Sequence, residues 1–491
     1  MTYTEDELIE RPAIYLFSDI GWQTLDCYSE VFGEEGTLGR ENRSEVILIR
    51  ELHEALIGIN PACTENEINL AIEEVVRDRS VMSAMAANEA SYKLICEGVK
   101  VKADDESEDS VTVKVIDWND VDNNSFLLCS QLWITGEIET RRPDLIGFVN
   151  GLPLVFIELK AAHRQLIHAY KDNLADYKRV IPQLFFFNQL VILSNGIQSK
   201  VGTVSSQWEH FADWKKIEKE DEPRVLSLET VIRGTCDKTR LLDIIENFIL
   251  FENKKATVKI VSKYHQYLGV NQALEGLKSI EEVQGKLGVF WHTQGSGKSF
   301  SMVFFCQKAF RKFAGNWTFV IVTDRTDLDE QIYKTFHACG LLKEECQAES
   351  ASDLKILLSE DHRFVFTLIH KFRAEQGESY PELSDRDDVI VITDEAHRSQ
   401  YATLALNMRS GLPNAGFMAF TGTPLLNKQQ DDEKTREVFG DYVSVYNFAD
   451  AVDDGATLPL YYENRVPEVN LNRDDLGDEI AEIIDNADLT D

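Results

Sequence analysis

The sequence predicts an α/β protein, and three stretches carry that prediction. The apolar run 287–291 breaks into a Gly-rich turn, and an apolar stretch with helical spacing follows at 300–313. The run 389–392 has the composition of a fully buried parallel strand. Upstream, two apolar stretches flank Asn150-Gly151, a dipeptide typical of a tight β-hairpin. The chain is therefore expected to fold into strands and helices around at least two sites of polar residues.

The turn after the strand at 287–291 has the composition of a phosphate-binding loop. Backbone N–H groups of a Gly-rich turn that opens a helix can wrap phosphate oxygens. Lys298 would add a positive charge for the β- and γ-phosphates, and Ser299 a hydroxyl for Mg²⁺. The strict pattern begins with Gly, where this chain has His292. The residues expected to touch the nucleotide are Thr293, Gly295, Ser296, Gly297, Lys298 and Ser299.

Two acidic residues follow the strand at 389–392. Asp394 is suited to hold Mg²⁺ through its water shell, and Glu395 to orient or deprotonate the water that attacks the γ-phosphate. Another buried run, at 417–420, ends in the hydroxyls of Thr421 and Thr423. A solvated acidic turn and a polar loop are the competing interpretations. The position of both segments after the phosphate loop favours nucleotide chemistry.

The hairpin around Asn150 carries an Asp, a Glu and a Lys. Asp144 opens its first strand, while Glu158 and Lys160 are two residues apart on the second and share one face, with Leu159 directed into the core. Two carboxylates can bind Mg²⁺, which activates a water and stabilises charge on a scissile phosphate, and Lys160 can position the nucleophile. The pattern predicts a metal-dependent phosphodiesterase site, although solvated charges at the edge of a strand would look similar.

Together these motifs resemble those of the restriction (R) subunit of type I restriction-modification enzymes. In that family a PD-(D/E)xK nuclease domain precedes a superfamily 2 motor of the DEAH type. The marks of the resemblance are Arg141-Arg142-Pro143-Asp144, Asn150-Gly151-Leu152-Pro153-Leu154, Ile157-Glu158-Leu159-Lys160, the stretch Trp208–Trp214 and the motor motifs in order. It implies a RecA-like parallel sheet with ATP at the carboxyl ends of the strands.

Further residue roles follow from the resemblance alone. Gln266 would read adenine, and Arg325 stands in the place of a motif that touches the nucleic-acid backbone. His397 completes the DEAH motif. Asn173 and Tyr177 lie in a helix expected over 161–181 and would help to position DNA or the metal. The family has Gln where this chain has the Asn, which leaves the role of that position open.

The resemblance also implies an activity of a larger complex. The R subunit joins methylase (M) and specificity (S) subunits and uses ATP to pull double-stranded DNA toward the complex. It then cleaves both strands of unmethylated DNA at a distant, non-specific position, with Mg²⁺. The recognised DNA sequence belongs to the specificity subunit, so this chain does not encode it.

Composition sets further limits. A chain of 491 residues with 43% hydrophobic content has room for two or three globular domains. Eight scattered cysteines without a CxxC pair, and no long apolar run, favour a cytoplasmic protein with no membrane span, and the resemblance implies a prokaryotic one. The net charge of −34 argues against tight autonomous DNA binding. Affinity for DNA is expected to come from partner subunits and from local basic groups. These groups are Arg141, Arg142, Lys254, Lys255, Lys259 and Lys263.

These landmarks divide the chain into a nuclease domain over 1–250, a motor domain over 251–470 and an acidic linker, or the start of a second motor domain, over 471–491. A superfamily 2 motor needs a second RecA-like domain whose Arg side chains complete the ATP site. The chain is therefore expected to be a fragment with half of a motor. Other elements are expected as helices at 4–20, 45–57, 65–80 and 238–251 and a strand at 184–193.

Two other functions remain open. The first is a superfamily 2 remodelling ATPase whose N-terminal domain is a non-catalytic DNA-binding or assembly module. It predicts that Glu158→Ala leaves cutting unchanged while ATP hydrolysis persists. The second is a non-catalytic assembly protein that docks on partners, and it predicts binding of neither Mg²⁺ nor ATP.

Overall fold

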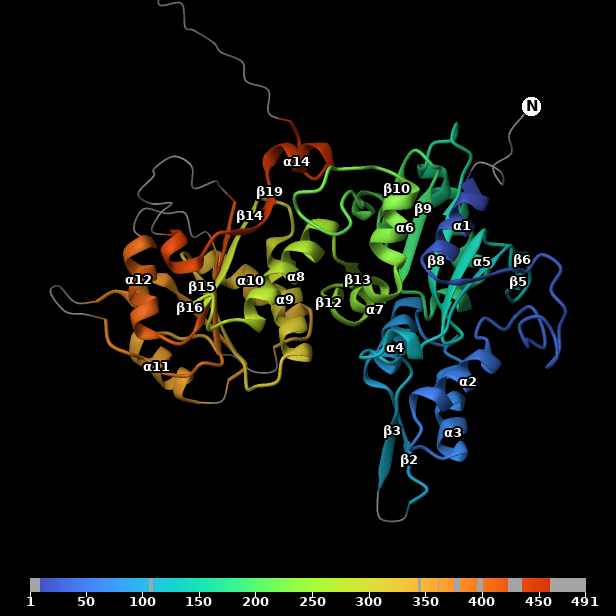
Figure 1. Ribbon diagram of the computed structural model, residues 1–491, viewed down its shortest axis with the longest axis horizontal. Helices are drawn as coiled ribbons and strands as arrows, with labels where there is room; N and C mark the ends of the chain where they lie inside the picture. The colour runs from blue at the N-terminus through green and yellow to red at the C-terminus, as the bar shows by residue number, and fades with distance from the viewer. Residues whose placement is uncertain are drawn as a thin grey trace, which may run out of the picture.

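The computed structural model describes residues 9–105, 109–342, 346–360, 362–374, 380–394, 401–422 and 435–459. Figure 1 shows two α/β bodies. The first body runs from helix α1 (Arg11–Asp19) to helix α7 (Lys238–Asn247), and the second from helix α8 (Tyr264–Lys278) to helix α14 (Phe448–Asp453). The antiparallel hairpin of β12 (Ile249–Asn253) and β13 (Thr257–Val261) lies between them. The predicted α/β class is confirmed.

The first body is built on a seven-stranded mixed sheet in the order β1-β4-β7-β8-β9-β10-β11. At its centre β8 pairs antiparallel with β7 and parallel with β9. Every residue of β7 and β8 is buried, in keeping with their nearly continuous apolar composition. The bounds are β1 Gln23–Asp26, β4 Phe126–Ser130, β7 Leu145–Val149, β8 Leu152–Leu159, β9 Leu190–Ser194, β10 Ser199–Gly202 and β11 Ala212–Asp213.

Helices surround this sheet, and local sequence signals start them. Helix α3 opens with a capping box, because Thr64 accepts a bond from Glu67 N and the Glu67 carboxylate accepts one from Thr64 N. The bounds are α2 Ile49–Ile59, α3 Glu65–Val76, α4 Ala84–Glu97, a π-helix Ala169–Leu174 that continues into α5 Ala175–Val180, and α6 Leu228–Cys236. Two small hairpins pair β2 (Val99–Lys102) with β3 (Ser110–Val113) and β5 (Ile134–Thr135) with β6 (Thr140–Arg141).

The turn between β7 and β8 is the Asn-Gly hairpin that the sequence predicts. Asn150 and Gly151 have φ of 49° and 76°, the left-handed values that a two-residue hairpin of this type requires. Asn150 also ties the turn to the neighbouring chain, because its Oδ1 accepts a bond from Ser125 N at 2.8 Å and its Nδ2 donates to Val115 O at 2.9 Å. The turn thus fixes the register of the two central strands.

A six-stranded, wholly parallel sheet forms the second body, in the order β16-β15-β17-β18-β14-β19. The strands predicted at 287–291, 389–392 and 417–420 are confirmed as β14, β17 and β18. Because all six strands run the same way, their carboxyl ends meet at one edge. The bounds are β14 Lys286–His292, β15 Thr318–Thr323, β16 Phe364–Leu368, β17 Val389–Asp394, β18 Gly416–Thr421 and β19 Tyr442–Tyr446.

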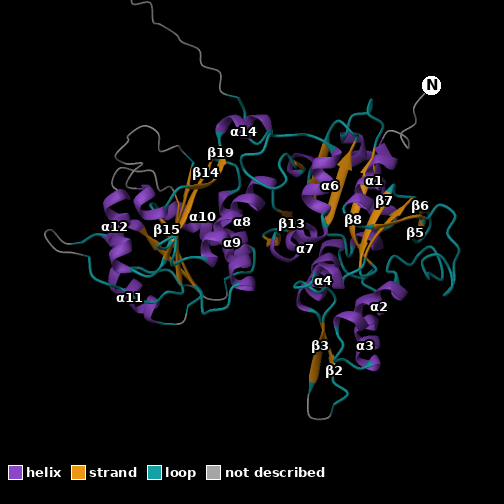
Figure 2. Ribbon diagram, viewed as in Figure 1, coloured by secondary structure: helices purple, strands orange, loops and turns teal. Residues whose placement is uncertain are grey.

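Helices lie on both sides of this parallel sheet. In Figure 2, α11 and α12 flank its strands on one side, and α8 and α9 on the other. Their bounds are α9 Lys298–Lys312, α10 Thr326–Ala338, α11 Ala351–Ser359 and α12 Tyr401–Gly411. This RecA-like arrangement is the one expected from the motor motifs. Among the helices of the described ranges, none is both long and apolar enough to span a membrane.

The hydrophobic core continues from the first body into the second. Phe248, which follows α7, has its ring 5.6 Å from that of Phe304 in α9 and 4.8 Å from that of Tyr267 in α8. On the other side of the hairpin, Tyr92 of α4 lies 5.2 Å from Phe251 of β12. Burying an aromatic side chain contributes on the order of 2 kcal/mol. These contacts therefore hold the hairpin and both bodies together.

The helix expected over 161–181 begins later than predicted. Residues 161–165 form turns, and the helical part is the π-helix that leads into α5. A tertiary hydrogen bond explains the difference, because Asn195 Nδ2 donates to Arg164 O at 2.8 Å and holds the chain in a turn. The expected end of the helix is close, since α5 ends at Val180.

Two other elements also differ in extent. The strand expected over 184–193 begins only at Leu190, because a 3-10 helix occupies the start of that stretch. The helix expected over 238–251 ends at Asn247, because the apolar run that follows pairs with β13 as a strand. A short apolar run suits either structure, and here the partner strand decides.

Candidate functional site

Three charged side chains meet at one end of the β7–β8 pair. The antiparallel register, continued by one residue, sets Asp144 opposite Glu158. Asp144 Oδ2 accepts a hydrogen bond from Leu159 N at 2.8 Å. Lys160 Nζ donates to Glu158 Oε1 at 2.7 Å. The structure therefore gathers the two carboxylates and the ammonium at a single strand end.

This strand end is largely shielded from solvent. Glu158 is 1% exposed and the Lys160 side chain 16%. Burying a carboxylate is unfavourable unless hydrogen-bond donors lie beside it, and the Lys160 side chain supplies one. Burial, followed by the charges of Glu158 and Asp144, holds the pKa of Tyr177 well above its usual range. The phenol therefore keeps its proton beside the two carboxylates.

Asn173 and Tyr177 stand next to this strand end. The Tyr177 hydroxyl donates to Arg142 O at 3.3 Å, and its ring packs 5.6 Å from that of Phe156, edge to face. Hydrogen bonds with Asn173 and Glu158 also act on the phenol. Asn173 lies in the π-helix, a local irregularity that often occurs at functional sites. The two residues thus flank the charged strand end that the sequence associated with them.

The two basic residues before β7, Arg141 and Arg142, contact other side chains of the protein. Arg141 forms ion pairs with Asp176 and Glu139. The Arg142 guanidinium lies over the ring of Trp133, 4.9 Å from its centroid. Arg141 is therefore paired within the protein, and Arg142 lies against an aromatic ring.

The prediction that Lys259 contributes to a basic groove before the second body is wrong. This side chain is 1% exposed, and its ammonium donates to Asn88 Oδ1 at 2.9 Å and to Asn188 O at 2.8 Å. Burial lowers its pKa well below the usual range. It fastens β13 to the first body and is not presented to solvent. Burial also lowers the pKa of Lys263, whereas the Lys254 side chain is 58% exposed.

The carboxylates at the β7–β8 end suit a hard divalent cation. Within the ranges that the structure describes, no three His, Cys, Asp or Glu side chains are grouped closely enough to hold a metal ion by themselves. Mg²⁺ commonly takes one or two carboxylates and keeps several waters or substrate oxygens. Asp144 and Glu158 fit that donor set. Ser299 and Asp394 offer a hydroxyl and a carboxylate of the same hard-oxygen kind in the second body.

The phosphate loop, residues 293–299, joins β14 to α9. Gly295 and Gly297 have φ of 81° and 94°, a region that favours glycine. Gly297 is the N-cap of α9, so the positive end of the helix dipole lies at the loop and favours an anion there. Lys298 Nζ donates to His292 O at 3.4 Å across the base of the loop. The loop thus has the conformation that the sequence predicts.

Gln266 lies against this loop and is 4% exposed. Its Nε2 donates to Gly297 O at 3.0 Å, and its Oε1 accepts a bond from Lys263 N at 2.9 Å. A Cβ on Gly297 would come within 2.8 Å of that Nε2. The amide therefore links the start of α8 to the phosphate loop. Its predicted role in reading adenine remains a prediction.

His292 stands where the strict loop pattern has Gly, and the structure accommodates it inside the sheet. The ring is fully buried, and Nε2 hydrogen-bonds Ser444 Oγ of β19 at 2.7 Å. Burial, and then the charge of Lys298, lowers its pKa to about 3, so the imidazole is neutral. His292 thus packs against the edge strand β19 and leaves the conformation of the phosphate loop intact.

Asp394 and Thr421 end adjacent strands at the same sheet edge as the phosphate loop. Asp394 pairs with Phe420 in the β17–β18 ladder, and Thr421 pairs with Trp291 in the β14–β18 ladder. Asp394 is 7% exposed. Ser299 lies in the first turn of α9, which starts from that edge. The predicted nucleotide and Mg²⁺ residues of the described ranges are therefore brought to one edge.

The structure describes only one of the last four predicted site residues. Glu395, His397 and Thr423 lie outside the described residues. Arg325 follows β15 as the N-cap of α10, with a side chain 53% exposed and its Nε 4.0 Å from Asp324. It is therefore at the carboxyl edge of the sheet and open to solvent.

No sequence pattern indicates the contact between the connection 213–224 and α14. Lys215 Nζ lies 2.8 Å from Asp453 Oδ2, and Arg224 Nη1 2.7 Å from Asp450 Oδ1. The Lys215 side chain is 2% exposed. Both segments are polar and charged, so each has the composition of a solvated surface. Only their approach in space reveals the ion pairs.

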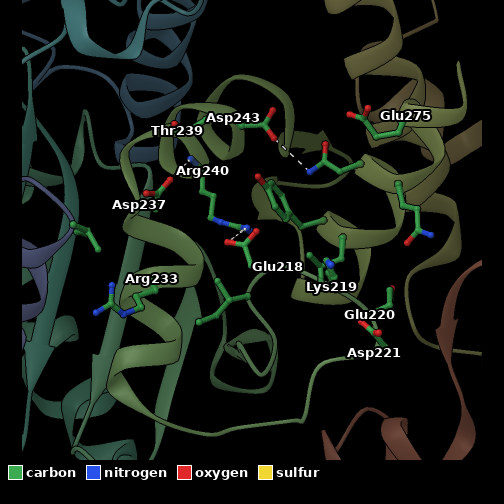
Figure 3. Close-up of a pocket in the computed structure, with 16 residues that line it drawn as sticks. Glu218, Lys219, Glu220, Asp221, Arg233, Asp237, Thr239, Arg240, Asp243 and Glu275 are labelled. Carbon is green, nitrogen blue, oxygen red and sulfur yellow. Dashed lines mark hydrogen bonds and ion pairs between the residues drawn. The ribbon is translucent and has the colours of Figure 1, made fainter. Parts of the chain in front are cut away.

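The same connection forms one wall of a cleft of about 1010 Å³, lined also by α6, α7 and α8. Figure 3 shows its charged lining, in which Arg240 pairs with Glu218 at 2.9 Å. Between α8 and α7, Asn271 donates to Asp243 at 3.5 Å. Acids predominate in this lining, but several are paired with neighbouring side chains. Several of the charged side chains that line this cleft are therefore bonded to one another.

Two family models match this chain. Residues 2–210 match the type I restriction enzyme R protein N terminus, and residues 265–491 match the SWI2/SNF2 ATPase. Solved structures match weakly. The UvsW helicase of bacteriophage T4 is 15% identical, over 40% of this chain and 62% of that one, with a TM-score of 0.30 that is too low to establish a common fold.

Curated relatives match nearly the whole chain. The type I restriction enzyme HindI endonuclease subunit of Haemophilus influenzae is 36% identical, over 97% of this chain and 47% of its own length. A protein assigned as the MjaIXP endonuclease subunit of a type I restriction enzyme, from Methanocaldococcus jannaschii, is 33% identical, over 98% of this chain and 48% of its own length. The chain thus spans about half the length of the curated relatives that it matches.

Proposed function

The chain is related to the endonuclease (R) subunits of type I restriction enzymes, and from this premise we propose that it cuts double-stranded DNA with Mg²⁺ and moves DNA with ATP. In the complete protein, ATP-driven translocation leads to non-specific cleavage of both strands of unmethylated DNA. Methylase and specificity subunits supply site recognition and most of the DNA affinity, which suits a chain with a net charge of −34. The complex is proposed to act in the cytoplasm of a prokaryote, the kind of organism from which both relatives come.

One observation carries the nuclease part of the proposal, the meeting of Asp144, Glu158 and Lys160 at one strand end. When bound, Mg²⁺ supplies an activated water and stabilises charge on the scissile phosphate. Asp144 and Glu158 are the residues proposed to hold it. Lys160, whose Nζ donates to Glu158 Oε1 at 2.7 Å, presents a proton donor to the phosphate or the attacking water. Tyr177 keeps its proton and adds no negative charge near the DNA.

The proposed ATP site lies at the carboxyl edge of the parallel sheet. Lys298, at the start of α9, is proposed to contact the β- and γ-phosphates, and Ser299 and Asp394 are proposed to hold Mg²⁺. Glu395 is the proposed base for the attacking water. Phosphate is proposed to contact Thr293, Gly295, Ser296 and Gly297, and the DNA backbone to contact Arg325. The residues proposed to couple ATP hydrolysis to DNA movement are His397, Thr421 and Thr423. The proposed domains are 1–250, 251–470 and 471–491.

The decisive experiment uses the full-length protein reconstituted with its methylase and specificity subunits. Wild type, Glu158→Ala and Lys298→Ala are compared for ATP hydrolysis and for cutting of unmethylated circular DNA. We expect Glu158→Ala to keep DNA-dependent ATP hydrolysis and lose cutting, and Lys298→Ala to lose both. Cutting by Glu158→Ala would refute the nuclease assignment.

A second candidate is a DNA-remodelling ATPase whose first body serves assembly. The contacts of Arg141 and Lys259 favour it, because these basic side chains bind within the protein. The same experiment separates the two. Retained ATP hydrolysis with no cutting by wild type, in the presence of both partner subunits, would support the remodelling function.

A further inference from the structure

Two arginine side chains of the first body lie against the same aromatic ring. The Arg142 guanidinium is 4.9 Å from the ring centroid of Trp133 and 5.1 Å from that of Tyr28. The Arg43 guanidinium is 5.4 Å from the Trp133 centroid. The rings of Tyr28 and Trp133 are themselves 6.3 Å apart. These four side chains form one group, which we call the arginine–aromatic cluster.

Both guanidinium groups of this cluster have N–H donors to spare. Within the ranges that the structure describes, neither Arg43 nor Arg142 forms a side-chain hydrogen bond or an ion pair, whereas Arg141 pairs with Asp176. The cluster is open to solvent, because Tyr28 is 56% exposed and Arg43 is also exposed. In a chain with a net charge of −34, two such cations make a local positive surface. A planar guanidinium binds phosphate oxygens through two parallel N–H groups.

Buried contacts hold the cluster in place. The loop between β1 and α2 carries two of its four side chains, and the Arg40 side chain, 1% exposed, fastens this loop. Arg40 Nε donates to Glu30 Oε1 at 2.8 Å, and its Nη2 donates to Trp133 O at 3.1 Å. Thr135 N donates to Arg43 O at 2.9 Å, which joins the loop to β5 (Figure 1). The cluster is therefore formed before any ligand arrives, which lowers the entropic cost of binding.

The cluster lies at the sheet edge that carries the proposed nuclease site. The ends of β1, β4 and β8 and the start of β7 meet at this edge. Tyr28 follows β1, Trp133 follows β4, and Arg142 stands two residues before Asp144. Two extended residues span about 7 Å, and neighbouring strands are about 5 Å apart. Successive phosphates of one DNA strand advance by about 3.4 Å along the duplex axis, so phosphates a few nucleotides from the cut are within reach of the cluster.

We propose that the arginine–aromatic cluster binds the phosphodiester backbone of duplex DNA beside the bond that is cut. The inference rests on the proposed nuclease function and adds a DNA-binding surface to it. Arg142 and Arg43 hold phosphates, and the rings of Trp133 and Tyr28 orient the guanidinium planes by cation–π contact. Contacts to phosphate carry no sequence information. The cluster therefore suits cleavage at non-specific positions.

The test uses the full-length protein reconstituted with its methylase and specificity subunits, and unmethylated circular DNA. Arg142→Ala is expected to cut about tenfold more slowly than wild type, with ATP hydrolysis unchanged. Its cutting should also depend less steeply on salt, with a slope of log rate against log salt smaller by about one, because one phosphate contact is lost. Arg142→Lys keeps the charge without the planar fork, so an intermediate rate with the salt slope of wild type is expected.

Arg43→Ala keeps the test valid where Arg142→Ala disturbs folding, because it changes an exposed side chain of the loop. It is expected to cut about fourfold more slowly, again with a salt slope smaller by about one. The matched control is Arg77→Ala, which removes another arginine of the first body, 70% exposed and paired with Glu74. This control is expected to cut as wild type does.

Each result for the cluster has a definite meaning. Cutting by Arg142→Ala and Arg43→Ala at the wild-type rate overturns the inference. Slower cutting with an unchanged salt slope also overturns it, because Arg142 would then only support the strand end. Failure of wild type to cut overturns the proposed nuclease function, and the cluster's role with it.

Discussion

The side-chain amide of Gln266 donates a hydrogen bond of 3.0 Å to the carbonyl oxygen of Gly297. Gly297 has φ of 94° and caps α9, so this bond acts on the most constrained peptide of the phosphate loop. The same amide accepts a bond from Lys263 N, which anchors it to the start of α8. The loop conformation thus depends on a residue more than thirty positions away in sequence. A base-reading glutamine alone would have no need of this contact.

Gln266→Ala is expected to weaken binding of ATP and of inorganic tripolyphosphate, which has the phosphates without a base, to the same extent. The variant loses two hydrogen bonds that hold the loop, which corresponds to about 1 to 2 kcal/mol of binding free energy, or roughly a tenfold change. Calorimetry with both ligands measures it. Gln272→Ala, an exposed position on the same helix, is the control. A loss confined to ATP would instead mean that Gln266 binds the base.

Gly297→Ala is expected to unfold more easily than wild type and to lose nucleotide binding. A left-handed Ala costs about 1 to 2 kcal/mol, and its Cβ would also lie within 2.8 Å of Gln266 Nε2. Gly340→Ala is the matched control, because that residue has φ of 75° and nothing within 4 Å of its Cβ position. Urea unfolding should show a larger loss for Gly297→Ala. Equal losses would show that the close approach to Gln266 has no effect.

The sequence was sufficient where chemistry and periodicity are local. The Asn150-Gly151 turn specifies its hairpin, and the alternation along the second strand places Glu158 and Lys160 on one side. The buried parallel strands were predictable from their unbroken apolar runs, and each ended at the predicted polar residue. Local patterns therefore located both candidate sites within the chain.

Contacts between distant segments could not be predicted in this way. Lys259 looked like a surface base, yet three-dimensional packing puts its ammonium 2.9 Å from Asn88 Oδ1, more than one hundred and fifty residues away. The run after Asn247 continues a helical pattern, and only its partner strand turns it into β12. A cavity beside the phosphate loop has walls from both bodies, so no single stretch of sequence encodes it.

Lys215→Met is expected to loosen α14 from the connection 213–224. The ammonium is 2% exposed and bridges Asp453 and Asp454, so its removal leaves Arg224 as the remaining cation beside both carboxylates. Asp453 is 65% exposed, so the expected cost lies between those of exposed and buried pairs, at about 1 to 3 kcal/mol. Hydrogen exchange of the α14 amides should speed up accordingly. Lys334→Met is the control.

The control is informative because Lys334 is 69% exposed and forms an ordinary helical pair with Glu330 at 2.9 Å. Such exposed pairs contribute only about 0.5 kcal/mol. Unchanged exchange of α14 in Lys215→Met would show that its ion pairs with Asp453 and Asp454 do not hold the two segments together.

Glu220 should make the stability of the protein depend on pH. Its side chain is 18% exposed and accepts a hydrogen bond from Ser444, and burial raises its pKa from 4.5 to about 7. Below pH 4.5 both folded and unfolded chains hold the proton. As the pH rises from 4.5 to 7 the unfolded chain releases it and the folded chain retains it, so the free energy of unfolding falls, by up to about 3 kcal/mol.

Glu220→Gln removes this titration while keeping an oxygen that can accept the bond from Ser444. The variant should match wild type in stability near pH 4.5 and exceed it increasingly up to about pH 7.5, where the difference levels off. Urea unfolding at a series of pH values measures the difference, with Glu275→Gln, whose carboxylate is 68% exposed, as the control. A difference between Glu220→Gln and wild type that does not change with pH would mean that the carboxyl is ionised in the folded protein across this range. The Glu220 carboxyl would then be too little buried within the connection 213–224 to stay protonated.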